Sequence, residues 1–107
     1  GVLGIPFQSA YTASKHAILG LTRSAALDAA AWGIRVNCLC PGTTSTPMME
    51  KQMKTRPNGL KGTLERIPLG RVATAVEQAN AAAWLLSDKA SFVTGEELVV
   101  DGGGTVR

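Results

Sequence analysis

Two side chains of this sequence, Tyr11 and Lys15, are spaced so that they can act together on a proton. On an α-helix, residues four positions apart lie on one face, about one turn from each other. A lysine held there favours the phenolate and lowers the tyrosine pKa from its ordinary value of about 10. Such a tyrosine can pass a proton to or from a substrate oxygen, as an alcohol–carbonyl interconversion requires. The alternative for an isolated pair is a half-buried tyrosine that packs on the lysine stem.

The composition of the chain is that of one small globular domain. Its 107 residues are 45% apolar, which is typical of folded rather than disordered chains. The net charge is +3, and the local cluster of cations is formed by Lys51, Lys54, Arg56 and Lys61. Because no aromatic residues are interleaved with them, we interpret this cluster as a solvated loop and expect no nucleic-acid partner. The sequence has no run of 18 apolar residues, so we expect no membrane partner.

The two cysteines, Cys38 and Cys40, are two positions apart in a predicted strand and therefore point to the same face. That geometry is too constrained for a sensible disulfide. With no histidine nearby and no second pair of cysteines, a zinc site is not expected. We interpret both as buried free thiols in a reducing compartment and expect a cytoplasmic protein.

The first predicted helix carries the tyrosine and the lysine. Residues 10–31 contain no proline and are dense in alanine and leucine, which favours a helix with Ser9 as N-cap. Gly33 is the predicted C-terminal stop. Gly20, inside the helix, indicates a close packing contact. The apolar stripe is expected at Ala13, Ala17, Leu21 and Ala25, with Ile18 beside it.

Two strands are predicted after this helix. Residues 34–40 alternate in the manner of a strand, and Pro41–Gly42 ends it. Residues 98–100 are short and continuously apolar, as expected for a strand covered on both faces. Because two strands are marginal alone and parallel strands need cover on both faces, the sequence predicts part of a larger α/β domain. The chain would complete the sheet of that domain with its two strands.

Short helical segments are predicted between the strands. Thr46 and Pro47 read as an N-cap and a first helical residue, and this helix runs to about Lys54. Residues 56–62 are interpreted as a mobile loop. Residues 63–67 are expected to form a short turn of helix before the next proline.

A second long helix is predicted to open with a capping box. Thr74 and Glu77 are spaced to satisfy each other's free backbone amides. The expected core positions of this helix are Val76, Ala79, Ala83 and Leu86.

Six blocks of the sequence, in this order, resemble the C-terminal portion of the short-chain dehydrogenases/reductases. They are YTASK at 11–15, IRVNCLCPG at 34–42, TPM at 46–48, RIPLGR at 66–71, DKASFVTG at 88–95 and VVDGG at 99–103. The resemblance covers nearly the whole chain and implies the C-terminal part of a doubly wound Rossmann-type parallel sheet. Residues 1–107 would then be one part of one domain, without its N-terminal phosphate-binding half. The blocks are similar to 3-oxoacyl carrier-protein reductases and to glucose dehydrogenases, and do not separate the two.

The resemblance implies an NAD(P)-dependent oxidoreductase that interconverts an alcohol and a carbonyl by hydride transfer. Tyr11 matches the general acid/base of the family. Lys15 matches the lysine that lowers the tyrosine pKa and binds the nicotinamide ribose. The substrate would be a small-molecule carbonyl or alcohol, and the cofactor NAD or NADP.

The loop after the first strand matches the family's cofactor-binding segment. The turn at Pro41 and Gly42 matches the segment that lies along the nicotinamide end of the cofactor. The backbone of Thr44 matches the position that bonds the carboxamide, and Thr46 a threonine whose hydroxyl contacts the cofactor. A loop at the carboxyl end of a strand suits this role, because open α/β sheets bind ligands there. Plain helix capping is the alternative for Thr46.

Three methionines, Met48, Met49 and Met53, fall in the family's substrate-binding loop. Flexible thioethers can line an adaptable apolar pocket, although packing of the short helix on the core is an equal alternative. His16 is expected to point away from the tyrosine. Asn37 is expected to make hydrogen bonds within the sheet rather than take part in chemistry.

Several functional parts of the family have no match between residues 1 and 107. These are the glycine-rich phosphate turn, the upstream asparagine and the active-site serine, since Ser9 is too close to Tyr11 to be that serine. We therefore expect the fragment alone to be inactive. The alternative function is that of a truncated, catalytically inactive remnant that acts only as an interaction or oligomerisation segment. The resemblance implies a homodimer or homotetramer when the protein is complete, with the long helix and final strand as contact surfaces.

Overall fold

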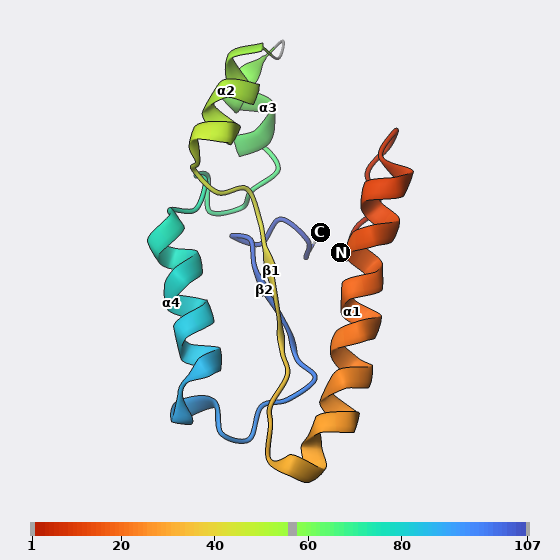
Figure 1. The fold of residues 1–107 in the computed structure, drawn as a ribbon. Coiled ribbons are helices and arrows are strands. Elements are labelled where there is room, and N and C mark those ends of the chain that lie inside the picture. The colour runs from red at the N-terminus through yellow and green to blue at the C-terminus, as the bar shows by residue number, and fades with distance from the viewer. Residues whose placement is uncertain (1, 56–57, 107) are drawn as a thin grey trace.

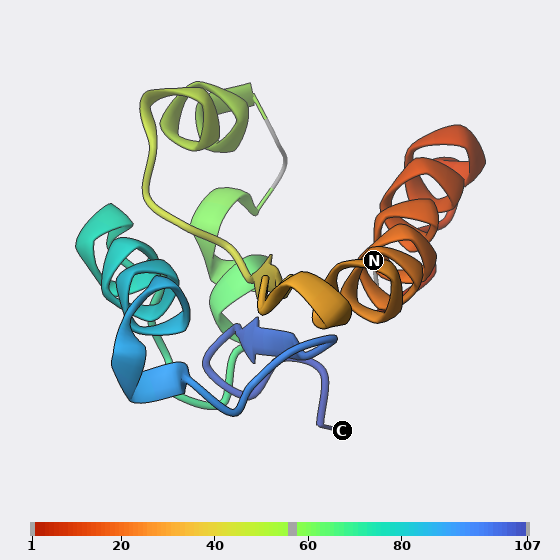
Figure 2. The ribbon, with the colours of Figure 1, turned by 60° about the horizontal axis from the view of Figure 1, so that its bottom comes forward.

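The computed structural model describes residues 2–55 and 58–106. Its elements, in chain order, are α1 (Ser9–Ala29), a 3-10 helix (Ala30–Trp32), β1 (Cys38–Pro41), α2 (Pro47–Thr55), α3 (Gly59–Leu64), α4 (Ala75–Leu86), a second 3-10 helix (Asp88–Ala90) and β2 (Glu97–Val100). Figure 1 shows α1 and α4 on opposite sides of the strands, with α2 and α3 beyond one end of them. Figure 2 shows the same layers from a second direction. Within the described residues, no helix combines the length and the apolar character needed to cross a membrane.

The two strands pair in parallel, as an α/β fold requires. Cys38 lies opposite Glu97, and Pro41 lies opposite Val100. The long α1 precedes β1, and α4 lies between the strands in sequence, so each face of the sheet has one helix beside it. The predicted layered arrangement around a parallel sheet is therefore confirmed.

The first strand begins at Cys38 and not at residue 34 as predicted. The preceding residues are held by side chains and by one backbone hydrogen bond, in which the Gly95 N–H donates to the Val36 carbonyl oxygen at 2.7 Å. The Val36 N–H donates to the Thr94 hydroxyl, and the Glu96 N–H donates to the Asn37 side-chain oxygen. Asn37 thus makes the sheet-linking hydrogen bonds expected of it.

The end of β1 passes very close to the end of β2. The Gly42 N–H donates to the Val100 carbonyl oxygen at 2.9 Å. A Cβ added to Gly42 would lie only 2.6 Å from the Cα of Asp101. No real Cβ tolerates that contact, so glycine is required here for close approach of two backbones.

The long helix α1 begins one residue earlier than predicted and ends at Ala29, two residues before the predicted end near residue 31. A 3-10 helix continues it over Ala30–Trp32, and Gly33 closes that helix with a left-handed φ of 67°, the conformation that glycine adopts most easily. At the start, the Thr12 N–H donates to the Gln8 carbonyl oxygen at 2.8 Å, which brings Ser9 into the helix. Gln8 therefore takes the N-cap position predicted for Ser9, without a side-chain cap hydrogen bond.

The packed face of α1 is not the predicted stripe. Leu21 and Ile18 are 64% and 47% exposed, and Ala13 and Ala17 are also exposed. The buried residues of the helix are Leu19, Thr22 and Ala26. The contact predicted at Gly20 is not made by any of the described residues, because nothing lies within 4 Å of a Cβ built there. In a helix so rich in alanine, the faces differ too little for periodicity to identify the buried side.

The second long helix, α4, has the predicted capping box but not the predicted core. The Glu77 N–H donates to Thr74 Oγ1 at 3.2 Å, and the Thr74 N–H donates to the Glu77 carboxylate at 2.8 Å. Leu85 is the buried residue of this helix. The positions predicted as core are exposed: Val76, Ala79, Ala83 and Leu86. A two-stranded sheet gives a helix too narrow a surface to bury a full stripe.

An ion pair reinforces the capping box. Arg71 Nη1 and Nη2 donate to the two oxygens of Glu77 at 2.9 and 2.6 Å. The Arg71 guanidinium, followed by the Thr74 N–H, lowers the pKa of the Glu77 carboxyl to about 2. Arg71, Thr74 and Glu77 therefore form one clip, called here the α4 clip, at the start of α4.

The segment between α2 and α4 contains a helix where a loop was predicted. Asn58 adopts a left-handed φ of 65° and caps α3, so residues 59–64 are helical. The Thr63 hydroxyl donates to Met53 Sδ at 3.8 Å and links α3 to α2. Arg56 and Pro57, also in the predicted loop, lie outside the described residues.

Two glycines allow opposite effects on stability to be predicted. Gly42→Ala is expected to lower the free energy of unfolding by about 1–3 kcal/mol, because the new methyl group overlaps Asp101. Gly20→Ala is the matched control and is expected to raise it by about 0.5–1 kcal/mol, because an open helical site gains propensity. Urea unfolding of the protein that carries this chain, followed by circular dichroism, measures both. A change of the same sign in the two variants would contradict the packing described here.

The α4 clip predicts a dependence of stability on pH. Since the folded-state pKa of Glu77 is lowered to about 2, its stabilisation is present above the unfolded pKa of about 4.3 and is lost as pH falls towards 2. Wild type should therefore be more stable than Glu77→Gln at pH 7, with a difference that vanishes near pH 2. Urea unfolding at a series of pH values tests this. Glu96→Gln removes an exposed carboxylate and should change the unfolding free energy by less than about 0.5 kcal/mol.

Candidate active site

The predicted catalytic pair lies at the end of the molecule where both strands finish. Tyr11 and Lys15 are in the first two turns of α1. Figure 1 shows α1 starting at the end towards which β1 and β2 run. In open α/β sheets, ligands bind at the carboxyl ends of the strands. The helix therefore presents the pair at the end of the fold suited to a ligand.

The structure brings Tyr11 and Lys15 together. Lys15 Nζ lies over the tyrosine ring, 5.3 Å from its centroid. A cation in this position is attracted to the face of the ring and places its charge beside the phenol. The Tyr11 side chain is exposed, so its hydroxyl is open to a partner from outside. The two side chains can thus act on one bound molecule.

Two polar side chains that lie near the pair in sequence, Ser14 and His16, contact the backbone of α1 itself. The Ser14 hydroxyl donates to the Tyr11 carbonyl oxygen at 2.7 Å. His16 Nδ1 lies 2.9 Å from the Thr12 carbonyl oxygen. Both contacts are local to α1 and leave the tyrosine hydroxyl and the lysine ammonium group without competition from these side chains.

The loop after β1 is positioned by a short parallel bridge. Thr44 pairs with Ala73, just before the α4 clip. The Ala73 N–H donates to the Thr43 carbonyl oxygen at 3.0 Å, and the Ser45 N–H donates to the Ala73 carbonyl oxygen at 2.8 Å. Because backbone groups alternate along an extended segment, the N–H of Thr44 faces away from this bridge. It has no hydrogen-bond partner among residues 2–55 and 58–106.

Thr46 is the predicted N-cap of α2, and this role is confirmed. The Met49 N–H donates to Thr46 Oγ1 at 3.2 Å, and Pro47 is the first residue of the helix. A threonine hydroxyl that accepts one hydrogen bond keeps its own proton to donate. Capping and contact with a bound group are therefore compatible at Thr46.

The three methionines lie on α2 and are not brought against the tyrosine. Met48 is exposed, whereas Met49 and Met53 are half-buried, and Met53 receives the hydrogen bond from Thr63. Figures 1 and 2 both show α2 apart from the start of α1, across the ends of the strands. Met53 is committed to packing α2 on α3, which leaves Met48 as the methionine most open to a ligand.

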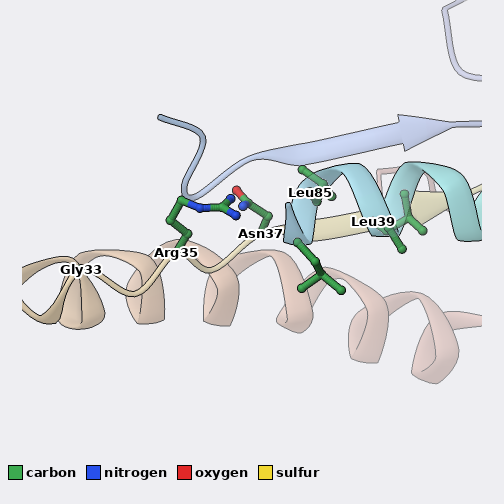
Figure 3. A pocket seen from close by; sticks show the side chains of 7 residues that line it. Gly33, Arg35, Asn37, Leu39 and Leu85 are labelled. Atoms are coloured by element: carbon green, nitrogen blue, oxygen red, sulfur yellow. The ribbon is translucent and has the colours of Figure 1, made fainter. Parts of the chain in front are cut away.

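A cavity of about 380 Å³ lies between α4 and the segment that leads into β1, residues 33–39 (Figure 3). Its lining residues are Gly33, Arg35, Asn37, Leu39, Ala82, Leu85 and Leu86. The Arg35 guanidinium donates to the carbonyl oxygens of Ser87 and Val93, so its charge is held by the backbone. None of the predicted catalytic or cofactor-binding residues lines this cavity.

Two features near the site are not found by sequence reasoning. Phe7 has a left-handed φ of 62° and is fully exposed, one residue before the N-cap of α1. Such a backbone conformation is rare for a bulky residue, and nothing in the local sequence signals it. The bridge from Ala73 to the Thr43–Ser45 loop is also missed, because a single long-range backbone pair leaves no periodic pattern.

Comparison with known proteins gives one consistent family. Residues 1–105 match the family model described as Enoyl-(Acyl carrier protein) reductase. The chain is 52% identical over 106 residues to the 2,5-dichloro-2,5-cyclohexadiene-1,4-diol dehydrogenase of Sphingobium indicum. That alignment covers 98% of this chain and 42% of the relative, so the chain spans about two fifths of that protein's length.

Solved structures have the same fold. A short chain dehydrogenase family protein from Francisella tularensis superposes with a TM-score of 0.93 at 38% identity, over 99% of this chain and 47% of that one. A structure from Agrobacterium tumefaciens with bound NADP gives 0.86 at 40% identity, over 94% and 43%. A 4-hydroxyisoleucine dehydrogenase complexed with NADH gives 0.90 at 32% identity, over 99% and 43%. The predicted Rossmann-type fold is confirmed, and the chain belongs to the short-chain dehydrogenase/reductase family.

Proposed function

We propose that the protein carrying this chain interconverts an alcohol and a carbonyl with a nicotinamide cofactor. The observation that carries the proposal is the exposed Tyr11 with the Lys15 ammonium over its ring, at the carboxyl ends of two parallel strands. Tyr11 is the general acid that protonates the carbonyl oxygen, and in the reverse direction the base that takes the hydroxyl proton. Lys15 holds its positive charge over the Tyr11 ring, beside the group that exchanges the proton. The nicotinamide, when bound, supplies or accepts the hydride.

The residues after β1 fit such a cofactor. The unpartnered Thr44 N–H is a donor suited to the carboxamide oxygen of the nicotinamide. The close turn at Pro41 and Gly42 would run along the same end of the cofactor, and the Thr46 hydroxyl keeps a proton to donate. Lys15 would bind the ribose. The cofactor is NAD or NADP, in keeping with the NADP and NADH held by two similar structures.

The proposed substrate is a small alcohol or carbonyl compound that enters beside the tyrosine. The relative named 2,5-dichloro-2,5-cyclohexadiene-1,4-diol dehydrogenase favours a secondary alcohol, since the diol in its name carries ring hydroxyls. Met48, exposed on α2, would offer a flexible apolar contact to such a substrate, with Met49 and Met53 supporting the helix behind it.

We also propose that the working protein needs more than residues 1–107. The described residues leave large apolar side chains exposed on α1, on α4 and in the following turns, among them Leu21, Leu27, Trp32, Leu86 and Phe92. Apolar surface of this extent normally lies against other protein. Further strands of the same domain and a second copy, in a homodimer or homotetramer, would cover it. The chain alone would then be inactive.

Removing the phenolic hydroxyl tests the catalytic role of Tyr11. Tyr11→Phe is expected to lower kcat by about 10²–10⁴-fold, the usual contribution of a general acid or base, and to leave cofactor binding nearly unchanged. Turnover with a panel of secondary alcohols and ketones, together with a fluorescence titration of the reduced cofactor, measures both. His16→Ala is the matched control, because its ring bonds only its own helix, and should retain wild-type turnover.

Two outcomes separate the alternatives. Wild-type turnover in Tyr11→Phe would overturn the assignment of the acid/base. A wild-type protein that neither turns over the panel nor binds reduced cofactor would favour the alternative of an inactive interaction segment.

Removing the lysine charge tests its proposed role towards the cofactor. Lys15→Met keeps an unbranched apolar stem but loses the cation that lies over the Tyr11 ring. The Kd of the reduced cofactor should increase and kcat/KM should fall, as measured by a fluorescence titration and by turnover. A wild-type Kd and wild-type turnover in Lys15→Met would contradict this role.

A further inference from the structure

The two cysteines take no part in the proposed reaction, yet the fold holds their sulfur atoms side by side. Cys38 Sγ and Cys40 Sγ are 3.9 Å apart and share a weak hydrogen bond. Both are free, as predicted, but they are half-buried rather than buried. They are also the only two cysteines of this sequence, so no other thiol between residues 1 and 107 competes with them.

The distance between the sulfur atoms is that of two thiols that are not bonded to each other. A disulfide needs about 2.05 Å between sulfur atoms and converging Cβ atoms. Two residues along a strand advance by about 6.6 Å with parallel side chains, which is near the upper limit for a bridged pair. The pair is therefore held as two thiols.

The same distance suits a single atom placed between the two sulfur atoms. Two thiolates on one tetrahedral zinc ion, each at about 2.3 Å from the metal, lie about 3.8 Å apart. The observed 3.9 Å is close to that value. However, no group of three or more metal-ligating side chains occurs within the described part of the chain, so a resident tetrahedral ion has too few ligands. The geometry is that of a two-point clamp.

The pair lies on the face of β1 next to α1. Leu39, between the two cysteines, lines the cavity on the α4 side (Figure 3), so its neighbours point the other way. Glu97, which pairs with Cys38 in register, is bound by Arg23 of α1 at 2.7 Å. Among the described residues, both cysteines on this face are half-buried.

We propose that Cys38 and Cys40 form a dithiol clamp that captures trivalent arsenic compounds. With an organic arsenoxide, R–As=O, two As–S bonds form while the As=O bond breaks. The oxygen leaves as water and takes both thiol protons, so nothing is oxidised or reduced and no co-reactant is needed. Each chain would bind one arsenic atom in a ring closed through the backbone of residues 38–40.

The raised pKa of Cys40 separates this reagent from ordinary thiol alkylation. Burial, followed by the hydrogen bond shared with Cys38, raises the pKa of the Cys40 thiol. Alkylating agents need the thiolate, so Cys40 should react slowly with iodoacetamide at neutral pH. Condensation with an arsenoxide consumes the protons of both thiols in the water that leaves, so the overall reaction takes up no proton and releases none.

Phenylarsine oxide is the probe that tests the clamp. The full protein that carries this chain is treated with one equivalent, digested with trypsin and mapped by mass spectrometry. The expected adduct is one phenylarsenic group on the peptide of residues 36–51, which holds both cysteines. It should survive a large excess of a monothiol and be released by a dithiol such as dithiothreitol, because only a dithiol can replace both sulfur atoms at once.

Two matched variants decide whether both sulfur atoms are needed. Cys38→Ala and Cys40→Ala each keep one thiol, and each should lose the adduct at least tenfold faster in the monothiol chase. Equal retention in either variant would overturn the clamp. The native wild-type protein gives a measurement that needs no variant: an adduct on this peptide that forms only after unfolding in urea, or no adduct at all, would also overturn it.

Discussion

The parallel pairing of β1 with β2 is the constraint on which the rest of the structure depends. It brings Gly42 against Asp101, where a side chain on residue 42 would have no room. The backbone therefore leaves both strands at the same end of the sheet. The loop that follows β1 then continues the pairing through Thr44 and Ala73. That bridge lies just before the α4 clip. It directs the backbone N–H of Thr44 away from Ala73, at the end of the sheet where α1 also begins.

The parts of the site that the sequence predicts are those encoded by neighbours along the chain. Tyr11 and Lys15 are one helical turn apart, so their proximity follows once a helix forms. The stop at Gly33 and the caps at Thr46 and Thr74 depend on a few adjacent residues, whose side chains or φ angles satisfy the ends of a helix. The family could also be predicted from the sequence, because the six blocks are short runs of adjacent residues that occur in the order typical of the family.

The parts that the sequence does not predict depend on what lies across space. The buried side of α1 depends on where the two strands pack against it. Because alanine occurs on every face of this helix, the sequence pattern does not indicate which face is buried. The predicted core of α4 is wrong because the two-stranded sheet is narrow, and Leu85 is the residue of this helix that it buries. The short helix α3 depends on Asn58 adopting a left-handed backbone, which composition does not reveal. The bridge at Ala73 is a single tertiary contact.

Proline at the end of β1 has a consequence for the outer edge of this strand. The N–H groups of Cys38 and Gly42 bond β2, so by alternation those of Asn37 and Leu39 face the opposite edge, where the described residues offer no backbone partner. Pro41, next in that series, has no N–H to offer. A neighbouring strand could therefore be held by donors only as far as Leu39. Pro41 therefore ends the series of donors on this edge, and an added strand cannot extend its hydrogen bonds through residue 41 into the turn at Gly42.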